Sequence, residues 1–550
     1  MEVAMSERAA TAGSEAIDAE LMPTDEQPAY HILGSVISDQ SSPTFEEVRF
    51  RLSPGAAVSP GDFVSIEARS PGSPERSWVL ARVLDVHEIN PHEDPQSATV
   101  RDVLPFDSDY AHEGESTVIY RIARTEPVEE LSALAGGATT EVRTLPRAGA
   151  IVIRPSADQI SLAMGFPSNP DDGIHIGNLH NDERVQVTLS PGAIQRHILI
   201  VGGIGSGKSY TRGVIGEELH CLGVPQVNLD VNGEMVHAAV ELGGMNLVPG
   251  RGGFTLPLGS LTREDLIDAV AGVNRGTNIE TLIGYSFDVL RREIQQRRRS
   301  AFGVDDLANE IETQAPNLKM EAASTLRPAQ QRVRALERLA YIGPRFDWVS
   351  ALQPGAFINI DCRGLLLSDL RIIAAAVARD LQDLAREKKI PFTVLSIDEF
   401  HLVAPNEDKQ VSTQVLREIA RIGRHYRLGL ILTTQSPADV DRSILKRLLT
   451  RFVHSIEPDQ LDSLRGVFAD APAEMVRGLP KLPQGTCALT GVAETIRHAT
   501  IVDVRRRVTH HGGATPDVWA DFRARGWSGK RSISGIQQAA QSHPTEQPDV

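Results

Sequence analysis

The chain has 550 residues, 41% hydrophobic and 23% charged, which is typical of a globular protein of about two to four domains. No apolar run reaches the ~20 residues that span a bilayer, and the N-terminus lacks the apolar segment of a secretory signal. We therefore expect a cytoplasmic protein with no membrane contact. The three cysteines have no disulfide or metal-ligand spacing, and the net charge of -16 argues against a protein that coats nucleic acid.

The N-terminal part divides into three segments. Residues 1–28 are acidic and predict a disordered tail. Short alternating runs broken by turn residues predict a small β-barrel over 29–110. Residues 111–195 mix strand-like stretches with a segment rich in Gly, Asn and Asp, and we interpret them as a connector to a second domain.

The second domain is expected over residues 196–515, and a polar C-terminal tail over 516–550. Its apolar runs predict five buried parallel strands, at 197–201, 225–230, 356–361, 392–397 and 428–434. Helical stretches between them indicate an α/β fold, a RecA-like P-loop core. A helical insertion over 262–345 opens with Thr262 and Asp265 at the spacing of a capping box.

A glycine-rich loop follows the first of these strands. Residues 202–209 read GGIGSGKS and match G-x-x-x-x-G-K-[ST] between a strand and a helix. Such a loop turns its backbone N–H groups toward phosphates, and the following helix adds its dipole. Lys208 is expected to bridge the β- and γ-phosphates of ATP, and Ser209 to bind Mg²⁺. The predicted nucleotide-binding residues are Gly203, Gly205, Ser206, Gly207, Lys208, Ser209 and Tyr210.

A P-loop ATPase also needs acidic residues at a second strand end. The run at 392–397 ends in Asp398 and Glu399, which predicts a Walker B motif. Asp398 would hold the magnesium shell, and Glu399 would polarise the attacking water. Asp361 also ends a strand, but no second acid follows it, so we favour a structural role there. Gln435, after the run at 428–434, is placed to contact the γ-phosphate, unless it only ends a strand.

Taken together, these segments resemble the HerA family of hexameric DNA translocases, over roughly residues 29–515. The likeness is carried by RHILIVGGIGSGKS, NLDVNGEM, IDEFHLVAP, REIARIGRHYRLGLILTTQSP and RRRVTHHGG. Two features depart from that family. Met235 stands where an aromatic residue is usual, and EFH replaces EEAH after Asp398, which still leaves Glu399 in place.

The resemblance implies roles that composition does not supply. Arg424 matches the family's arginine finger, which completes the site of a neighbouring subunit, and Arg196 matches a further arginine near that nucleotide. Arg417, Arg421 and Arg424 also recur at helical spacing, so a solvated helix face is the alternative.

The resemblance further implies that Asp230 and Glu234 couple the site to DNA. It also implies that Arg506, Arg507 and His510 belong to an arm packed on the next subunit. The arginine-rich run at 291–300 invites a DNA-binding role, but without interleaved aromatic residues a solvated or protein-docking face is favoured.

Three functions remain open. The leading one is a homohexameric ATPase that threads double-stranded DNA and works with a partner nuclease in DNA repair or antiviral defence. The second is a ring that activates an effector, such as a NurA-like nuclease or a sirtuin-like NADase, with translocation secondary. The third, a secretion or conjugation ATPase, is disfavoured because no transmembrane segment is evident and a barrel precedes the P-loop.

Overall fold

The computed structural model forms two compact units, Met1–Pro127 with Val142–Pro155 and Val128–Glu141 with Ser156–Val550. It describes residues 31–38, 42–69, 76–89, 120–132, 139–167, 169–250, 253–406, 410–464, 471–492, 496–512 and 523–524. The expected acidic tail lies outside these residues, as does all of the C-terminal tail except 523–524. Among the described helices, none combines the length and apolar character needed to cross a membrane.

The first sheet closes into the small barrel that the sequence predicts. Its strands run in the order β2-β1-β7-β3-β4-β5-β6, and β2 also pairs with β5. This second pairing closes a ring of six strands, which buries Phe50, Ile66 and Val79 completely. The strands are β1 (Ile32–Val36), β2 (Val48–Leu52), β3 (Phe63–Arg69), β4 (Arg76–Ile89), β5 (Tyr120–Leu131), β6 (Thr139–Thr140) and β7 (Ile151–Ile153).

The prediction of one connector over residues 111–195 is wrong, because this segment contributes strands to both sheets. The predicted end of the barrel at residue 110 is therefore wrong as well. β5 and β7 are barrel strands, and β7 pairs with both β1 and β3. β8 (Ile174–Leu179) and β9 (Asp182–Leu189) instead belong to the second sheet. The physical reason is that β7 has only three residues, too few to show a period, and its partners lie far away in sequence.

The second sheet has eleven strands, in the order β12-β13-β11-β14-β15-β10-β16-β17-β18-β8-β9. The seven from β12 to β16 are parallel, and the remaining strands are antiparallel. β15 lies between β10 and β14. The strands are β10 (Ile198–Val201), β11 (Gln226–Asp230), β12 (Met245–Leu247), β13 (Phe357–Asp361), β14 (Thr393–Ile397), β15 (Leu428–Thr434), β16 (Thr450–Val453), β17 (Thr486–Gly491) and β18 (Thr500–Val504).

The five predicted strands are confirmed as β10, β11, β13, β14 and β15. Every residue in these strands is buried, as expected for a parallel sheet covered on both faces. Because parallel strands end at one edge of the sheet, the loops after β10, β11, β14 and β15 meet there.

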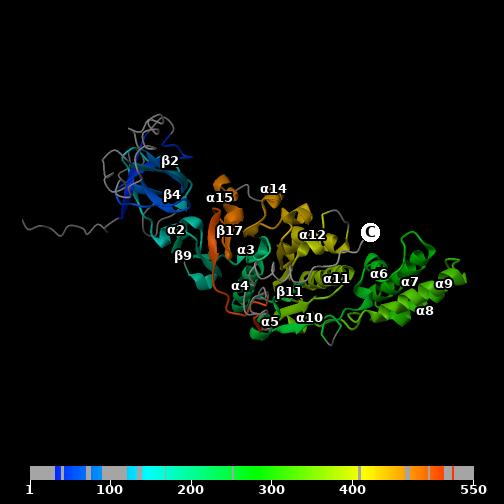
Figure 1. Ribbon diagram of the computed structural model, residues 1–550. Helices are drawn as coiled ribbons and strands as arrows, with labels where there is room; N and C mark the ends of the chain where they lie inside the picture. The colour runs from blue at the N-terminus through cyan, green and yellow to red at the C-terminus, as the bar shows by residue number, and fades with distance from the viewer. Residues whose placement is uncertain are drawn as a thin grey trace, which may run out of the picture. The chain divides into compact units, whose positions relative to one another are not determined.

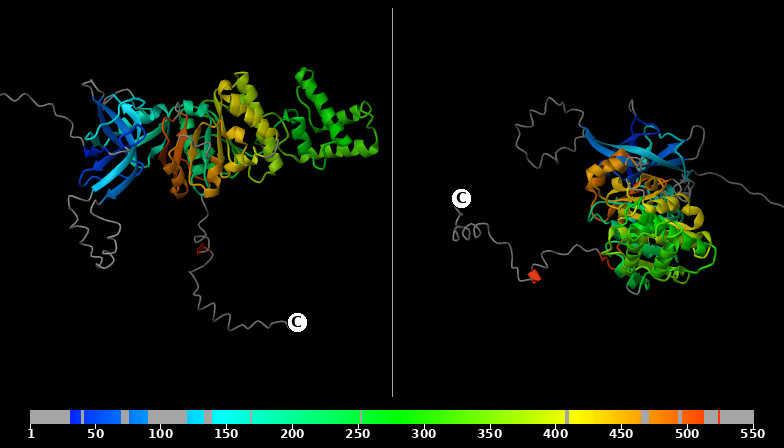
Figure 2. Two further views of the ribbon diagram at one scale, coloured as in Figure 1. Left: turned by 90° about the horizontal axis from the view of Figure 1, so that it is seen from above. Right: turned by 90° about the vertical axis from the view of Figure 1, so that its right-hand side faces the viewer.

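The helices of the second unit include the predicted insertion. Thr262 and Asp265 form the expected capping box at its start. Figures 1 and 2 show α6 to α9 gathered at one end of this unit, beside α11. The helices are α2 (Ala157–Met164), α3 (Gly192–Gln195), α4 (Lys208–Cys221), α5 (Val236–Glu241), α6 (Arg263–Ala269), α7 (Asn278–Gln295), α8 (Val304–Gln314), α9 (Ala323–Arg334), α10 (Trp348–Ala351), α11 (Leu367–Arg386), α12 (Val411–Ile422), α13 (Arg442–Leu445), α14 (Leu461–Leu464) and α15 (Ala473–Gly478).

Candidate nucleotide site

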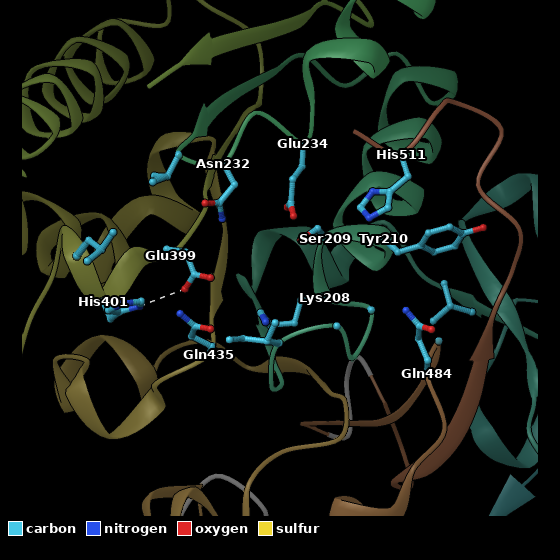
Figure 3. Close-up of a pocket in the computed structure, with 17 residues that line it drawn as sticks. Lys208, Ser209, Tyr210, Asn232, Glu234, Glu399, His401, Gln435, Gln484 and His511 are labelled. Carbon is cyan, nitrogen blue, oxygen red and sulfur yellow. Dashed lines mark ion pairs between the residues drawn. The ribbon is translucent and has the colours of Figure 1, made fainter. Parts of the chain in front are cut away.

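A pocket of about 800 Å³ opens where β10 passes into α4 (Figure 3). The loop between them turns through Gly205 and Gly207, whose φ angles of 73° and 114° suit glycine. A Cβ at Gly202 would lie 2.4 Å from Ser206 Oγ and 2.7 Å from His454 Cβ, so a side chain there would displace the loop. The lining residues are Ile204, Gly205, Gly207, Lys208, Ser209, Tyr210, Val231, Asn232, Glu234, Glu399, His401, Leu402, Gln435, Gln484, Gly485, Val504 and His511.

Lys208 lies at the centre of this pocket, at the start of α4. Its Nζ donates a hydrogen bond to the Gly203 carbonyl over 3.0 Å, and the Ser206 hydroxyl donates to the same oxygen over 2.8 Å. Burial lowers the pKa of Lys208, although the charges of Glu399 and Asp398 oppose that shift. A phosphate chain would therefore supply the negative charge that this buried ammonium group favours.

Gly203 and Ser206 are not among the pocket-lining residues, although the sequence predicts both to bind the nucleotide. The Gly203 N–H donates to the Ser455 carbonyl over 2.7 Å, and Ser206 is tied back within the loop. Both residues hold the loop in shape here. The other predicted loop residues, including Tyr210, line the pocket.

Asp398 is buried at the end of β14. One carboxylate oxygen accepts hydrogen bonds from the Thr433 hydroxyl at 2.7 Å and the Glu399 N–H at 3.0 Å. The other oxygen accepts from the Asn232 amide at 3.1 Å. Three chain segments thus hold one carboxylate beneath the pocket. Asp361, the rival strand-end acid, lies in β13 and is bound by the Arg363 guanidinium at 2.6 Å.

Glu399 projects into the pocket on the same side as His401 and Gln435 (Figure 3). Its φ of 44° and ψ of 49° are left-handed, an uncommon backbone conformation for glutamate that is often found at functional sites. Burial would raise the pKa of Glu399, but His401, 3.3 Å away, and Lys208 hold it below its ordinary value. The side chain is therefore a carboxylate at neutral pH and able to accept a proton.

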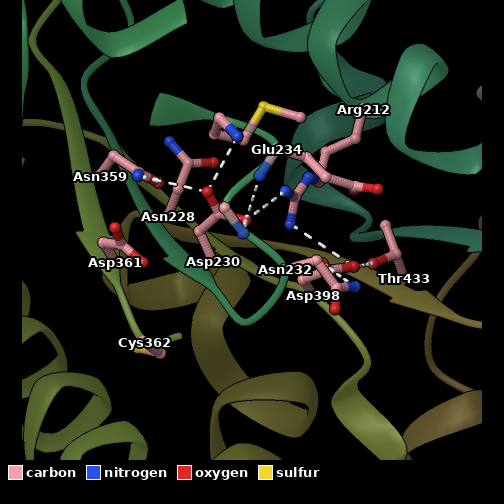
Figure 4. A network of polar contacts seen from close by, with 12 residues as sticks. Arg212, Asn228, Asp230, Asn232, Glu234, Asn359, Asp361, Cys362, Asp398 and Thr433 are labelled. Atoms are coloured by element: carbon pink, nitrogen blue, oxygen red, sulfur yellow. Dashed lines mark hydrogen bonds and ion pairs between the residues drawn. The ribbon is translucent and has the colours of Figure 1, made fainter. Parts of the chain in front are cut away.

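The loop after β11 brings two further polar side chains to the pocket, Asn232 and Glu234 (Figure 4). Asp230, at the end of β11, is fully buried and accepts the N–H groups of residues 233, 234 and 235 over 2.8–3.0 Å. Gly233 supplies the positive φ of 77° that this turn requires. Asp230 therefore shapes the loop and does not itself reach the pocket.

Arg212 is a buried residue of this site that the sequence did not predict. It lies on α4 with its side chain 1% exposed, 3.4 Å from Asp230 and 3.7 Å from Asp398 (Figure 4). Burial alone would lower its pKa, but the charges of Asp398 and Asp230 hold the pKa of the guanidinium above its ordinary value. One cation thus joins the helix after the P-loop to the ends of β11 and β14.

We expect Arg212→Met to lower the free energy of unfolding by about 3–5 kcal/mol, because two buried carboxylates lose their cation. Thermal denaturation should register this as a fall in melting temperature of about 5 °C or more. Arg275→Met is the matched control, since Arg275 pairs with Asp268 but is 69% exposed. Its effect should stay below about 1 kcal/mol. Equal melting temperatures for the two variants would contradict the structural role of Arg212.

Two arginines are predicted to act from a neighbouring subunit, and the structure describes the side chain of one of them. Arg196 follows α3, is half-buried, and is not among the lining residues. Arg424 lies in the 3-10 helix η6 (Gly423–Tyr426) after α12, and its side chain is outside the described part of the structure. Their roles across a subunit interface remain predictions.

Two other arginine groups have contacts within the chain. In the run at 291–300, Arg299 pairs with Glu293 and Asp306, which agrees with a solvated face. Arg507, assigned to an arm on the next subunit, has a side chain 1% exposed against α4 of its own chain. The Arg507 side chain is therefore held within its own chain, and the interface role of the arm stays a prediction.

The oxygen atoms beside the loop fit Mg²⁺. Ser209 and Glu234 both line the pocket, and Glu234 Oε2 is buried without a hydrogen-bond partner among the described residues. Hard oxygen donors of this kind suit Mg²⁺ better than soft metals. Within the described ranges no group of three or more His, Cys, Asp or Glu could hold an ion. Phosphate oxygens and water would therefore complete its shell.

Comparisons with known proteins agree with this geometry. Residues 174–381 match the family model "Helicase HerA, central domain", and residues 348–457 match "ATPase family associated with various cellular activities". A DNA double-strand break repair helicase HerA of Pyrococcus furiosus is 22% identical over 82% of this chain and 88% of its own. The HerA helicase of Sulfolobus acidocaldarius is 22% identical over 64% of this chain and 72% of its own.

Among solved structures, VirB4 of Thermoanaerobacter pseudethanolicus is 14% identical with a TM-score of 0.49. The match covers 61% of this chain and 97% of VirB4. The family matches and the pocket together identify the chain as an ATP-hydrolysing enzyme.

Proposed function

We propose that this chain, which belongs to the HerA family, hydrolyses ATP to drive its movement along double-stranded DNA. The observation that supports this best is the pocket in which Lys208 and Ser209 of the P-loop face Glu399 and Gln435. A nucleotide-binding protein that only changes conformation when ATP binds needs Lys208 and Ser209 alone. A motor that turns over repeatedly also needs a carboxylate beside the phosphate.

The side chains divide the chemistry between them. Lys208 would neutralise the β- and γ-phosphates, and Ser209 and Asp398 would hold Mg²⁺ beside them. When bound, that ion offsets charge on the phosphate oxygens. Glu399 polarises the attacking water and accepts its proton. Gln435 contacts the γ-phosphate from the end of β15, so its contact is lost when hydrolysis releases that phosphate.

We propose further that the working form is a homohexamer in the cytoplasm. Arg424 and Arg196 of one subunit would then complete the nucleotide site of the next, because a fixed guanidinium offsets charge that develops in the transition state. The relatives from Pyrococcus furiosus and Sulfolobus acidocaldarius are named DNA double-strand break repair helicases. On that ground we propose a partner nuclease acting on DNA ends, in repair or in antiviral defence.

The test of DNA movement is ATP turnover with and without linear duplex DNA. We expect duplex DNA to raise turnover, and the DNA concentration needed for half of that effect to rise at least tenfold between ~50 and ~200 mM salt. The physical reason is that the protein must grip phosphates with localised basic groups while its net charge is -16.

The same measurement separates the second function. A ring that serves only to activate an effector would have turnover insensitive to DNA and altered by the effector alone. In that case the second function, a ring that activates an effector, would replace the DNA translocase as the proposed function. Glu399→Gln serves as the control for contaminating ATPases, since its background should not respond to DNA.

A further inference from the structure

The nucleotide pocket continues well past the phosphate loop, to an end opposite Glu399. There Tyr210 and His511 line the pocket together with Gln484 (Figure 3). The rings of Tyr210 and His511 lie edge to face, with centroids 5.9 Å apart and planes at 74°. Since Tyr210 directly follows Ser209, the pair of rings formed by Tyr210 and His511 begins where the phosphate site ends.

His511 reaches the pocket on a segment that we call the strap, residues 504–511. The strap is tied to α4, the helix that begins at Lys208. The Arg507 N–H donates to the Tyr210 hydroxyl at 2.6 Å. Glu217 Oε1 accepts the N–H groups of Val508 at 2.9 Å and Thr509 at 2.7 Å. Strap and phosphate loop are thus anchored to one helix.

The contacts of His511 define its chemical form. Its Nδ1 lies 3.2 Å from Arg507 Nη1, and because a guanidinium can only donate, Nδ1 accepts that hydrogen bond. Burial, with the charges of Arg507 and Arg212, lowers the pKa of His511, so the ring is neutral at pH 7. A neutral ring then carries its hydrogen on Nε2, a donor suited to the ring nitrogens of a purine.

We propose that Tyr210 and His511 form the subsite for the base of the nucleotide, so that the strap must be docked on α4 for the nucleoside to be held. A flat base meets one ring face-on and the other at its edge, the arrangement that aromatic quadrupoles favour. The inference rests on the proposed function, since it takes the triphosphate to lie at the other end of the pocket. By linkage, a bound nucleoside stabilises the docked strap in return.

The decisive variant is His511→Ala, titrated calorimetrically with ATP and with inorganic tripolyphosphate. Loss of one stacking partner should weaken ATP binding about tenfold and leave tripolyphosphate binding unchanged. His510→Ala is the matched control. His510 is adjacent and of the same type, but it is 84% exposed and bound to Glu241, so neither ligand should be affected. Unchanged ATP binding in His511→Ala, or equal loss for both ligands, would overturn the subsite.

A second measurement follows the strap in the unaltered protein. Amide hydrogen exchange at Val508 and Thr509 should slow when ATP binds and stay unchanged with tripolyphosphate, because only ATP carries a base. Equal slowing by both ligands would mean that the strap responds to phosphate, and the proposal would fail. Failure of the nucleotide site on which the proposed function depends looks different, since neither ligand would then bind the wild-type protein.

Discussion

Replacement of Glu399 by Gln is expected to lower ATP turnover by about 100-fold or more while ATP still binds. The amide keeps the size of the side chain but cannot accept a proton from water. Binding should survive because Lys208 and Ser209 are untouched. Turnover is measured by phosphate release and affinity by calorimetry on the same preparation.

Lys208→Ala is the complementary variant for this experiment. It removes the cation at the centre of the pocket, so we expect ATP affinity itself to fall by about tenfold or more. The two variants therefore separate binding from hydrolysis. Near-normal turnover in Glu399→Gln would mean that another group activates water, and the Walker B assignment would have to be given up.

The parts of the fold that could be predicted from sequence are those whose signal is local. The five central strands are continuous apolar runs, since both of their faces are covered. The phosphate loop needs glycine at Gly205 and Gly207 for its φ angles. These glycines belong to the sequence motif itself, so the loop can be recognised without the structure. The two acids at the end of β14 are adjacent in the chain as well as in space.

The parts that could not be predicted depend on contacts between distant residues. Arg212, on a helix, gives the local pattern of a solvated charge, and only the fold shows that Asp230 and Asp398 enclose it. The strap joins α4 through Glu217, which is 291 residues before Val508. β16 was not predicted because Thr450 and Arg451 interrupt its apolar pattern, although both residues are buried.

Arg424 presents the same difficulty at the level of the assembly, because the role proposed for it requires a second copy of the chain. We expect an Arg424→Ala ring to assemble and bind ATP but to lose turnover by about 1,000-fold or more, as when an arginine finger is removed. Arg421→Ala is the matched control. Arg421 lies on the exposed side of α12 three residues earlier, and its loss should leave turnover unchanged.

Mixing two inactive proteins tests whether Arg424 acts between subunits. Equal amounts of Arg424→Ala and Glu399→Gln proteins are mixed so that their subunits exchange between rings. The mixed rings then contain some interfaces in which both groups are intact. In a closed ring an intact site needs an Arg424→Ala subunit followed by a Glu399→Gln subunit, so about a quarter of the sites should recover. If full subunit exchange is demonstrated by mass and no turnover returns, Arg424 acts within its own chain or only structurally. A fully active monomer in light scattering would exclude the ring itself, since no neighbour would then be present to supply the arginine.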